Sequence, residues 1–325
     1  MSLAIIVPAY KPDFLKEAIE SIINQTNHNF ILYIYNDASP FDLDIIIYPF
    51  LLKYSNIKYN KFEKNFGGND LVSHWNRCID STSEEWIWLF SDDDIMGEFC
   101  VENFYKTLQL SNADLYRFNT EVFSSNNTIS TISIHPERED VLSFLKNRLE
   151  RKINSFVVEY IFSREIYLST GKFVNFPLAW ASDDATWIKF GMNKGIHLIS
   201  QNDVVKWRYS ELNISSGKQN IKIDSSILFI KWCDSLFLSS NTYHKIISKE
   251  LKENWIYHQI NLVSSNLYYS SIVHYSKLLS IQFNKTFYYY FILIYIKHSF
   301  LFSKPRNIIA RIRNRISKVI NHKTE

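Results

Sequence analysis

The first two hundred residues alternate short apolar, β-branched runs with stretches of helical periodicity. Four of the runs predict strands, at Leu3–Val7, Phe30–Tyr35, Ile57–Phe62 and Trp86–Phe90. The stretches between them predict helices from Pro12 to about Gln25 and over Ile45–Tyr54 and Asn69–Ile79. Regular alternation of strand and helix is typical of an α/β fold with a mostly parallel sheet and flanking helices.

The pattern changes further along the chain. The sequence predicts a helix over Phe99–Leu110, a strand over Leu115–Phe123, a polar loop over residues 124–136 and a helix over Asp184–Lys194. Two strands, near His197–Ser200 and Val204–Tyr209, are expected to pair, and from about Ile221 the period is helical. We therefore expect an α/β domain over residues 1–215 and a helical region over residues 216–325.

Charge is distributed unevenly along the chain. The net charge is +3, but residues 304–325 hold seven Lys or Arg and one acid, which leaves 29 basic and 32 acidic side chains elsewhere. A body that is slightly acidic argues against a nucleic-acid binder. In the tail, Ile308, Ile312 and Ile316 share one helical face, and Arg311 and Arg315 lie mostly on the other. This pattern fits a helix on an anionic membrane surface, and equally a terminal helix packed on its own domain.

Cysteine usage and the N-terminus bear on localisation. Cys78, Cys100 and Cys233 are an odd number with no CxxC pair, which fits a reducing compartment. The start of the chain lacks the basic segment and longer apolar run of a signal peptide. The apolar stretch Thr286–Ile296 is too short to span a membrane. We expect a cytoplasmic protein that is peripheral on the inner face of the membrane.

Three consecutive carboxylates follow the fourth predicted strand, at Asp92, Asp93 and Asp94. Adjacent carboxylates repel one another, so a positive group should offset them. A hard cation such as Mn²⁺ or Mg²⁺ takes oxygen ligands and leaves positions for phosphates. Ligands of parallel α/β sheets bind at the carboxyl ends of the strands. The alternative is that these residues form only an acidic helix N-cap.

Five short motifs resemble those of family 2 glycosyltransferases of the GT-A fold, in order and in spacing. They are Val7-Pro8-Ala9-Tyr10, Asn36-Asp37-Ala38-Ser39, Asn65-Phe66-Gly67-Gly68, Asn76-Arg77-Cys78-Ile79 and Ser91-Asp92-Asp93-Asp94. The resemblance covers roughly the first 210 residues. It departs from the family at Ser91, where the usual Asp-x-Asp-Asp element begins with Asp, so it leaves open which of the three aspartates contact the metal.

The resemblance implies roles for these residues. Pro8, Ala9 and Tyr10 would border the nucleotide base, commonly a uracil, and Asp37 would hydrogen-bond it. Asn65 and Gly68 would lie on a loop near the donor, and Arg77 would lie close to the diphosphate. Asp92 and Asp93 would contact the donor, and Asp92, Asp93 and Asp94 would provide the metal ligands.

A second acidic site, Trp180-Ala181-Ser182-Asp183-Asp184, resembles the family's Glu-Asp element, with Asp183 in place of Glu. A carboxylate here would take the proton of the attacking acceptor hydroxyl, and we expect Asp184, with Asp183 in reserve, to be this base. The alternative is a helix cap, which is compatible with catalysis. Trp180 could stack on the acceptor sugar, and Arg208 could pair with a phosphate of the donor.

The expected activity is inverting, metal-dependent transfer from a nucleotide-diphosphate sugar, with UDP expected ahead of GDP or dTDP. The acceptor would be a carbohydrate or lipid-linked glycan, as in surface polysaccharide biosynthesis. The alternatives are a catalytically silent glycan-binding or scaffold protein on the same fold, and a nucleotidyltransferase. The last would need a glycine-rich basic loop after the first strand, and Pro8-Ala9-Tyr10-Lys11-Pro12 is not one.

Overall fold

The computed structural model describes residues 1–124, 128–199, 203–209, 219–263, 269–283 and 287. It groups the chain into two compact units, residues 1–251 and 252–325. The predicted domain boundary, between residues 215 and 216, lies outside the described residues, as do the basic tail and nearly all of the apolar stretch 286–296.

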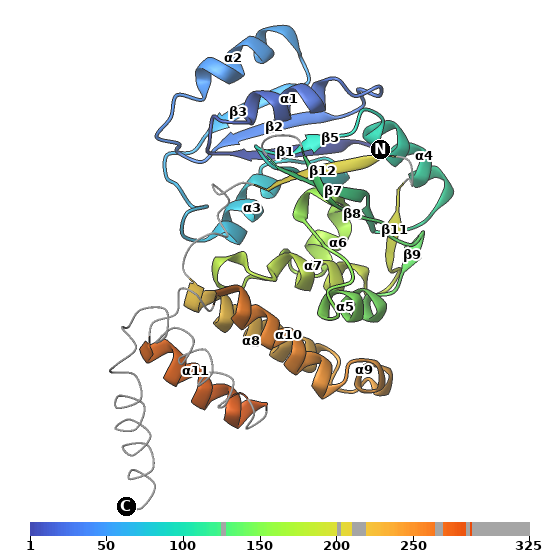
Figure 1. Cartoon of the computed structure of the whole chain (residues 1–325). Coiled ribbons are helices and arrows are strands. Elements are labelled where there is room, and N and C mark those ends of the chain that lie inside the picture. The colour runs from blue at the N-terminus through green and yellow to red at the C-terminus, as the bar shows by residue number, and fades with distance from the viewer. Residues whose placement is uncertain (125–127, 200–202, 210–218, 264–268, 284–286, 288–325) are drawn as a thin grey trace, which may run out of the picture. The chain divides into compact units, whose positions relative to one another are not determined.

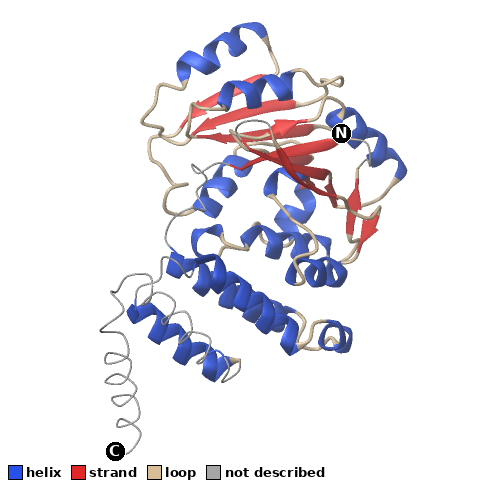
Figure 2. Cartoon of the chain, viewed as in Figure 1, coloured by secondary structure: helices blue, strands red, loops and turns tan. Residues whose placement is uncertain are grey.

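The larger sheet of the first unit has eight strands in the order β3-β2-β1-β4-β10-β6-β11-β9 (Figures 1 and 2). The strands are β1 (Leu3–Ala9), β2 (Ile31–Asn36), β3 (Ile57–Lys61), β4 (Trp86–Leu89), β6 (Leu115–Arg117), β9 (Arg138–Glu139), β10 (Tyr160–Ser163) and β11 (Ile196–Leu198). β3, β2, β1 and β4 are parallel, and β10 runs antiparallel to β4 and β6. The four predicted strands and their parallel pairing are confirmed.

Helices cover both faces of this sheet. α1 (Leu15–Ile23) and α2 (Asp44–Lys53) lie on one side, and α3 (Leu71–Asp80) lies on the other (Figure 1). This arrangement follows from right-handed connections: the chain steps from β1 outward to β3 and then returns to β4 beside β1. The strand order therefore reverses between β1 and β4. In doubly wound sheets, the carboxyl ends of the strands at such a switch point border the crevice where ligands bind.

A smaller sheet has the order β5-β12-β7-β8, with β5 (Ile95–Met96), β7 (Asn119–Ser124), β8 (Ile129–Ser133) and β12 (Val204–Tyr209). The single strand predicted over Leu115–Phe123 is wrong in one respect: it divides at Phe118 into β6 and β7, which belong to different sheets. The expected pairing of the last two strands is also wrong, because β11 pairs with β6 and β9, and β12 with β5 and β7. The polar segment predicted as a loop forms β8, which pairs with β7.

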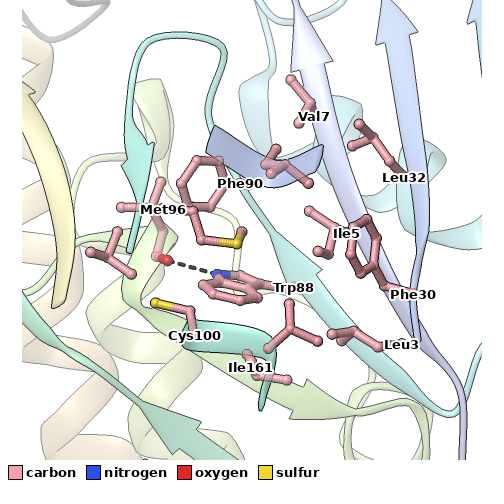
Figure 3. Close-up of a cluster of buried hydrophobic side chains, with 14 of the residues drawn as sticks. Leu3, Ile5, Val7, Phe30, Leu32, Trp88, Phe90, Met96, Cys100 and Ile161 are labelled. Carbon is pink, nitrogen blue, oxygen red and sulfur yellow. Dashed lines mark hydrogen bonds between the residues drawn. The ribbon is translucent and has the colours of Figure 1, made fainter. Parts of the chain in front are cut away.

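The core fills the space between the larger sheet, α1 and α4 (Cys100–Leu110). Trp88 of β4 is completely buried, and its indole N–H donates to the carbonyl of Val158 over 2.7 Å (Figure 3). Its ring stacks on Phe118, with 5.1 Å between centroids. Because β4 is buried on both faces, all of its residues are apolar. The packing of its large aromatic side chains also fixes the position of the strand that the acidic residues follow.

The remaining helices of the first unit come before and after the second acidic site in the sequence. They are α5 (Val141–Leu149), α6 (Arg164–Ser169), α7 (Ser182–Gly191), α8 (Gln219–Leu236) and α9 (Asn241–Ile246), with 3₁₀ turns η1 (Val157–Glu159) and η2 (Pro177–Ala179). α8 contacts both η2 and α7, and the hydroxyl of Ser225 donates to the carbonyl of Pro177 over 2.7 Å. Helix α8 is therefore part of the unit that carries the acidic site.

The second unit is helical in its described part. It contains all but the first turn of α10 (Lys249–Val263), together with α11 (Tyr269–Gln282). Tyr257 stacks on Phe287 with 4.1 Å between ring centroids. Within the described residues, no helix is both long and apolar enough to cross a membrane.

Candidate active site

Three strand ends meet at the crevice and are joined by hydrogen bonds. The backbone N–H of Asp37 donates to the carbonyl of Ala9 over 3.0 Å, and the hydroxyl of Ser39 donates to the carbonyl of Tyr10 over 2.6 Å. From the end of β4, Asp92 Oδ2 accepts hydrogen bonds from the backbone N–H groups of Tyr10, at 2.8 Å, and Lys11, at 3.1 Å. The sequence motifs after β1, β2 and β4 therefore form one contiguous site.

The acidic turn after β4 holds three carboxyl groups in different surroundings. Asp94 is buried, and its Oδ1 accepts the backbone N–H of Arg208 over 2.7 Å. Its Oδ2 is also buried and has no hydrogen-bond partner in the part of the chain that the structure describes. Asp93 Oδ1 accepts from the hydroxyl of Ser91 over 2.6 Å. Desolvation, with the charge of Asp93 second, raises the pKa of Asp92 to about 6 and that of Asp94 well above its usual range. Such a turn needs additional positive charge to remain ionised.

The donor set of this turn fits a hard divalent cation held by few protein ligands. Carboxylate oxygen is the ligand that Mg²⁺ and Mn²⁺ prefer, and the unsatisfied Asp94 Oδ2 is a polar atom that a cation would satisfy. Among the described residues, no three His, Cys, Asp or Glu side chains are grouped so as to hold a metal ion by themselves. The arrangement therefore suits Mg²⁺-type binding, in which one or two carboxylates share the ion with substrate phosphates and water.

Arg208 lies near the end of β12, and its side chain contacts the acidic turn. Its guanidinium is buried between the rings of Phe14 and Phe123, at 4.0 and 4.4 Å from their centroids. Its Nε donates to the carbonyl of Asp93 over 2.7 Å, and Nη2 donates to Glu17 over 2.6 Å. These contacts hold the guanidinium inside the protein. The phosphate contact expected of Arg208 stays a prediction. The residue supports the acidic turn.

The carboxylate of Asp37 organises the loop that follows β3. It accepts hydrogen bonds from the side-chain amide of Asn65 at 2.9 Å, the backbone N–H of Phe66 at 3.0 Å, and that of Gly67 at 2.7 Å. Gly67 has no room for a side chain, since a Cβ would lie 2.8 Å from Asp37 Oδ2. Asp37, which is expected to hydrogen-bond the base, and Asn65, which is expected on a loop near the donor, are thus brought together. The backbone N–H of Gly68 donates to Asn65 Oδ1 over 3.0 Å.

Arg77 of α3 completes this cluster. Its guanidinium donates to Asp37 and to the carbonyl of Lys64, and it lies between the rings of Phe62 and Phe66, at 3.7 and 4.1 Å. A carboxylate offers about four acceptor positions. In Asp37 they are taken by donors of Asn65, Phe66, Gly67 and Arg77. The described contacts therefore give Asp37 and Arg77 a part in shaping the loop beside the crevice.

The second acidic site lies at the start of α7. Asp184 is buried and forms a two-pronged ion pair with Arg148 of α5: Nε lies 2.9 Å from Oδ1, and Nη2 lies 2.8 Å from Oδ2. Asp183 is only partly buried. Desolvation, with the charge of Asp184 second, raises the pKa of Asp183 to about 7. The two neighbouring carboxyl groups thus have different environments, which is typical of sites where one of them handles a proton.

The backbone leading into this site is strained. Leu178, Ala179 and Ala181 have φ values of 59°, 54° and 62°, in the left-handed region that favours glycine, as does Ala38 after Asp37 with φ 50°. Such conformations cost of order 1–3 kcal/mol each and cluster at functional sites. Of the six non-glycine residues with positive φ among the described residues, four flank the two predicted motifs, which supports their assignment as parts of a site.

Trp180 lies in this strained segment, and Lys222 of α8 places its ammonium 4.6 Å from the centre of the indole ring. Burial lowers the pKa of Lys222. The same segment also contacts helix α3. The 3₁₀ turn η2 packs against α3, and the Asn175 side-chain amide donates to Asp70, the N-cap residue of α3, over 3.1 Å. The second acidic site is therefore connected to the helix that follows the Asn65–Gly68 loop.

Three residues of the site are absent from the sequence-based predictions: Arg148, Glu17 and His74. His74 is buried beside Asp37, and desolvation lowers its pKa to about 4. His74 could have been found by its spacing, three residues before Arg77 on the same helix face. Arg148 and Glu17 carry no comparable signal, because their partners lie 36 and 191 residues away in sequence.

Comparison with known proteins agrees with this geometry. Residues 4–167, just over half of the chain, match the model of the family described as Glycosyl transferase family 2. The structure is similar to that of S. aureus TarS 1–349 in complex with UDP-GlcNAc, with a TM-score of 0.59 and 15% identity over 88% of this chain and 90% of that chain. The corresponding TarS complex with UDP has a TM-score of 0.53, 14% identity and the same coverage. No curated protein sequence matches the chain. The chain therefore belongs to glycosyl transferase family 2 and is a glycosyltransferase with the GT-A fold.

Proposed function

We propose that the chain transfers a sugar from a UDP-sugar to a hydroxyl group of a cell-wall or surface polysaccharide, with inversion and with the help of a divalent cation. Family membership supports sugar transfer. Solved complexes of the structurally similar TarS contain UDP and UDP-GlcNAc, which supports a uridine nucleotide as the leaving group. The observation that carries the proposal is the acidic turn after β4, which is fastened to the end of β1 at the sheet's crevice and contains the unsatisfied Asp94 Oδ2.

In this proposal the donor lies in the crevice. Pro8, Ala9 and Tyr10 border the base, and the loop organised by Asp37, Asn65 and Gly68 closes one side of its pocket. The carboxylates of Asp92 to Asp94 would hold Mn²⁺ or Mg²⁺, and Asp94 is the principal candidate ligand because its Oδ2 has no hydrogen-bond partner among the described residues. When bound, the cation neutralises charge on the departing diphosphate.

The acceptor is activated at the other acidic site. A carboxylate of the Asp183–Asp184 pair takes the proton of the acceptor hydroxyl as its oxygen attacks the anomeric carbon from the side opposite the diphosphate. The resemblance favours Asp184 for this role. Both oxygens of Asp184 accept hydrogen bonds from Arg148. Trp180 provides an aromatic surface on which the acceptor sugar stacks.

The biological setting follows from the same proposal. The acceptor would be a lipid-linked or polymeric glycan at the cytoplasmic face of the membrane, reached with the basic tail of residues 304–325 on the membrane surface. A catalytically silent glycan-binding or scaffold protein remains the second candidate, since a GT-A fold by itself does not establish turnover.

The test is turnover of UDP-GlcNAc, UDP-glucose and UDP-galactose with Mn²⁺, measured as UDP release and repeated with EDTA. We expect release with one of these donors, loss of release with EDTA, and a product of inverted anomeric configuration by NMR. Binding of a glycan without turnover of any nucleotide sugar would instead support the silent protein. Release that is unaffected by EDTA would contradict the metal-dependent part of the proposal.

A further inference from the structure

Helix α2 is apolar on every side, although only one side faces the core. Its residues are charged only at the two ends, at Asp44 and Lys53. Ile47 is buried, and Phe50 and Leu51 pack against the core cluster. A helix on the surface of a protein normally presents polar residues on the side away from the core. The outer side of α2 is instead apolar, and packing in the core does not account for it.

Three large side chains are exposed on that outer side. Ile45 is 73% exposed, Tyr48 is 53% exposed and Leu52 is 90% exposed. Because they are spaced three and four residues apart, they share one face of the helix, which we call the α2 surface. Pro49 on the same helix and Phe41 in the turn before it are also exposed. Single exposed apolar residues are common, but a group of them on one face marks a surface that contacts another molecule or a membrane.

Basic side chains surround the α2 surface. The helix packs beside α1 and the edge strand β3 (Figure 1), and these two elements add Lys16 and Lys61 to Lys53 at the end of α2. Lys61 lies on the side of β3 that faces α2, because residues two apart on a strand share a side and the hydroxyl of Tyr59 donates to Asp44 of α2. All three lysines are exposed. This charge favours an anionic partner.

Acidic side chains are fewer on this part of the chain. From Ile45 to Phe62 there are three lysines and no acid, whereas the body of the chain outside the basic tail has more acids than bases. Asp42 and Asp44 precede the apolar stretch, at the helix N-terminus, where the helix dipole favours negative charge. On α1, Glu20 lies 3.8 Å from Lys16 and offsets part of its charge. Positive charge therefore predominates around the α2 surface.

We infer that the α2 surface docks on an anionic lipid bilayer. Exposed aliphatic side chains, an aromatic ring and flanking lysines together hold a helix in the plane of a membrane. Ile45 and Leu52 insert at the boundary between headgroups and acyl chains, and Tyr48 lies at the level of the headgroups. Lys53 and Lys61 reach the lipid phosphates. A protein partner covering this surface would have to pair or bury the lysines, whereas a bilayer accepts long basic side chains at its headgroups.

Docking through α2 also orients the candidate active site. The helix begins shortly after Asp37 and packs on the sheet whose strand ends form that site. A bilayer bound to α2 therefore has a fixed direction relative to the crevice. Because lipid binding requires no turnover, it can be tested separately from the proposed function.

The first measurement places a fluorophore on the α2 surface of the full chain. Cys78, Cys100 and Cys233 are buried, so a polarity-sensitive dye such as NBD reacts selectively with the Leu52→Cys variant. On vesicles of phosphatidylglycerol and phosphatidylcholine, we expect the emission to shift to shorter wavelength and to strengthen, because the dye enters a less polar layer. Leu110→Cys is the matched control. Leu110 is also in the last turn of a helix and is 88% exposed on α4, and a dye there should not respond.

The second measurement is binding to the same vesicles by co-sedimentation. In Ile45→Glu/Leu52→Glu the affinity should fall roughly tenfold or more, because two acids replace side chains that enter the membrane. Lys53→Gln/Lys61→Gln should weaken binding roughly fivefold for each lysine. Leu110→Glu should bind like the wild type. All these side chains are exposed, so the variants should keep the wild-type melting temperature.

Three results would overturn the inference. One is failure of the wild type to bind the anionic vesicles. Another is binding without a response of the dye at position 52, which would assign the membrane contact to another part of the chain, such as the basic tail. The third is a wild type that is dimeric by light scattering and becomes monomeric in Ile45→Glu/Leu52→Glu, which would assign the surface to a second copy of the chain. Vesicle binding as expected, without UDP release from any donor, would support the docking surface and overturn only the proposed function.

Discussion

The backbone N–H of Arg208 lies 2.7 Å from Oδ1 of Asp94, and this contact joins the last strand of the smaller sheet to the acidic turn of the larger one. The Arg208 side chain reinforces the contact by donating to the carbonyl of Asp93. Its positive charge is compensated by Glu17 and by the faces of two aromatic rings. The conformation of the candidate metal site therefore depends on the packing of a strand more than one hundred residues away in sequence.

Arg208→Met should destabilise the protein by about 3 kcal/mol, because it removes a buried, hydrogen-bonded charge and leaves the carbonyl of Asp93 without its partner. Urea unfolding measures this change. Lys206→Met on the same strand is the control: the Lys206 side chain is 42% exposed and lies 3.5 Å from Glu121, so this pair should contribute at most about 1 kcal/mol. Equal losses for the two variants would show that Arg208 does not support the turn.

Asp37→Asn should lower the free energy of unfolding by about 2–3 kcal/mol. Phe66 and Gly67 donate to different oxygens of Asp37, so the asparagine side chain presents an N–H₂ group to one of these two backbone donors. It also leaves Arg77 without its anion. Because the same loop borders the donor, UDP binding measured by calorimetry should weaken as well. Asp42→Asn, at an exposed position nearby, should change neither quantity appreciably. Unchanged UDP affinity in Asp37→Asn would separate the loop from the donor site.

Asp183→Asn should make the protein more stable at pH 8 by about 1–2 kcal/mol. The pKa of Asp183 is raised from its ordinary value of 3.8 to about 7 in the folded state. Between these values the folded chain binds a proton that the unfolded chain has released, so the wild-type contribution is fully present below pH 3.8 and is lost as the pH rises through about 7. Thermal unfolding across pH 4 to 8 should show the wild type losing stability relative to the variant. Parallel profiles would mean that Asp183 has an ordinary pKa.

Arg148 and Asp184 should show strong energetic coupling. Either Arg148→Met or Asp184→Asn alone removes one partner of a pair whose carboxylate is buried, and each should cost about 3 kcal/mol. The double variant should cost less than the sum of the two, with a coupling energy of about 1.5–3 kcal/mol in a double-mutant cycle measured by urea unfolding. Additive effects would show that the contact contributes little to the folded state.

Local patterns in the sequence were sufficient to place the strand ends and hence to predict which motifs lie together at the candidate site. The apolar run before Asp92 marks a buried strand, and the motifs after β1 and β2 must then meet it at one edge of a parallel sheet. The pairing of distant strands could not be predicted in the same way. The hydrophobic pattern of a strand indicates which of its residues are buried, but not which other strand pairs with it. This is why β11 and β12 were expected to pair and in fact belong to different sheets.

The sequence also could not predict in which direction individual side chains point. Arg208 on a strand end can point toward a ligand or into the protein, and the choice is made by Phe14, Glu17 and Phe123, which come from two other elements. Asp183 and Asp184 look equivalent in sequence. They are distinguished by Arg148, which reaches them only through the packing of α5 on α7.

The most direct test of the metal and diphosphate site is a thermal-shift measurement of UDP binding with and without Mn²⁺, for wild type and for Asp94→Asn. We expect UDP to raise the melting temperature of the wild type only when Mn²⁺ is present, and Asp94→Asn to abolish this Mn²⁺-dependent shift while remaining folded. A wild type that gains the same stabilisation from UDP in EDTA, or an Asp94→Asn variant that keeps the full Mn²⁺-dependent shift, would contradict the assignment of the acidic turn after β4.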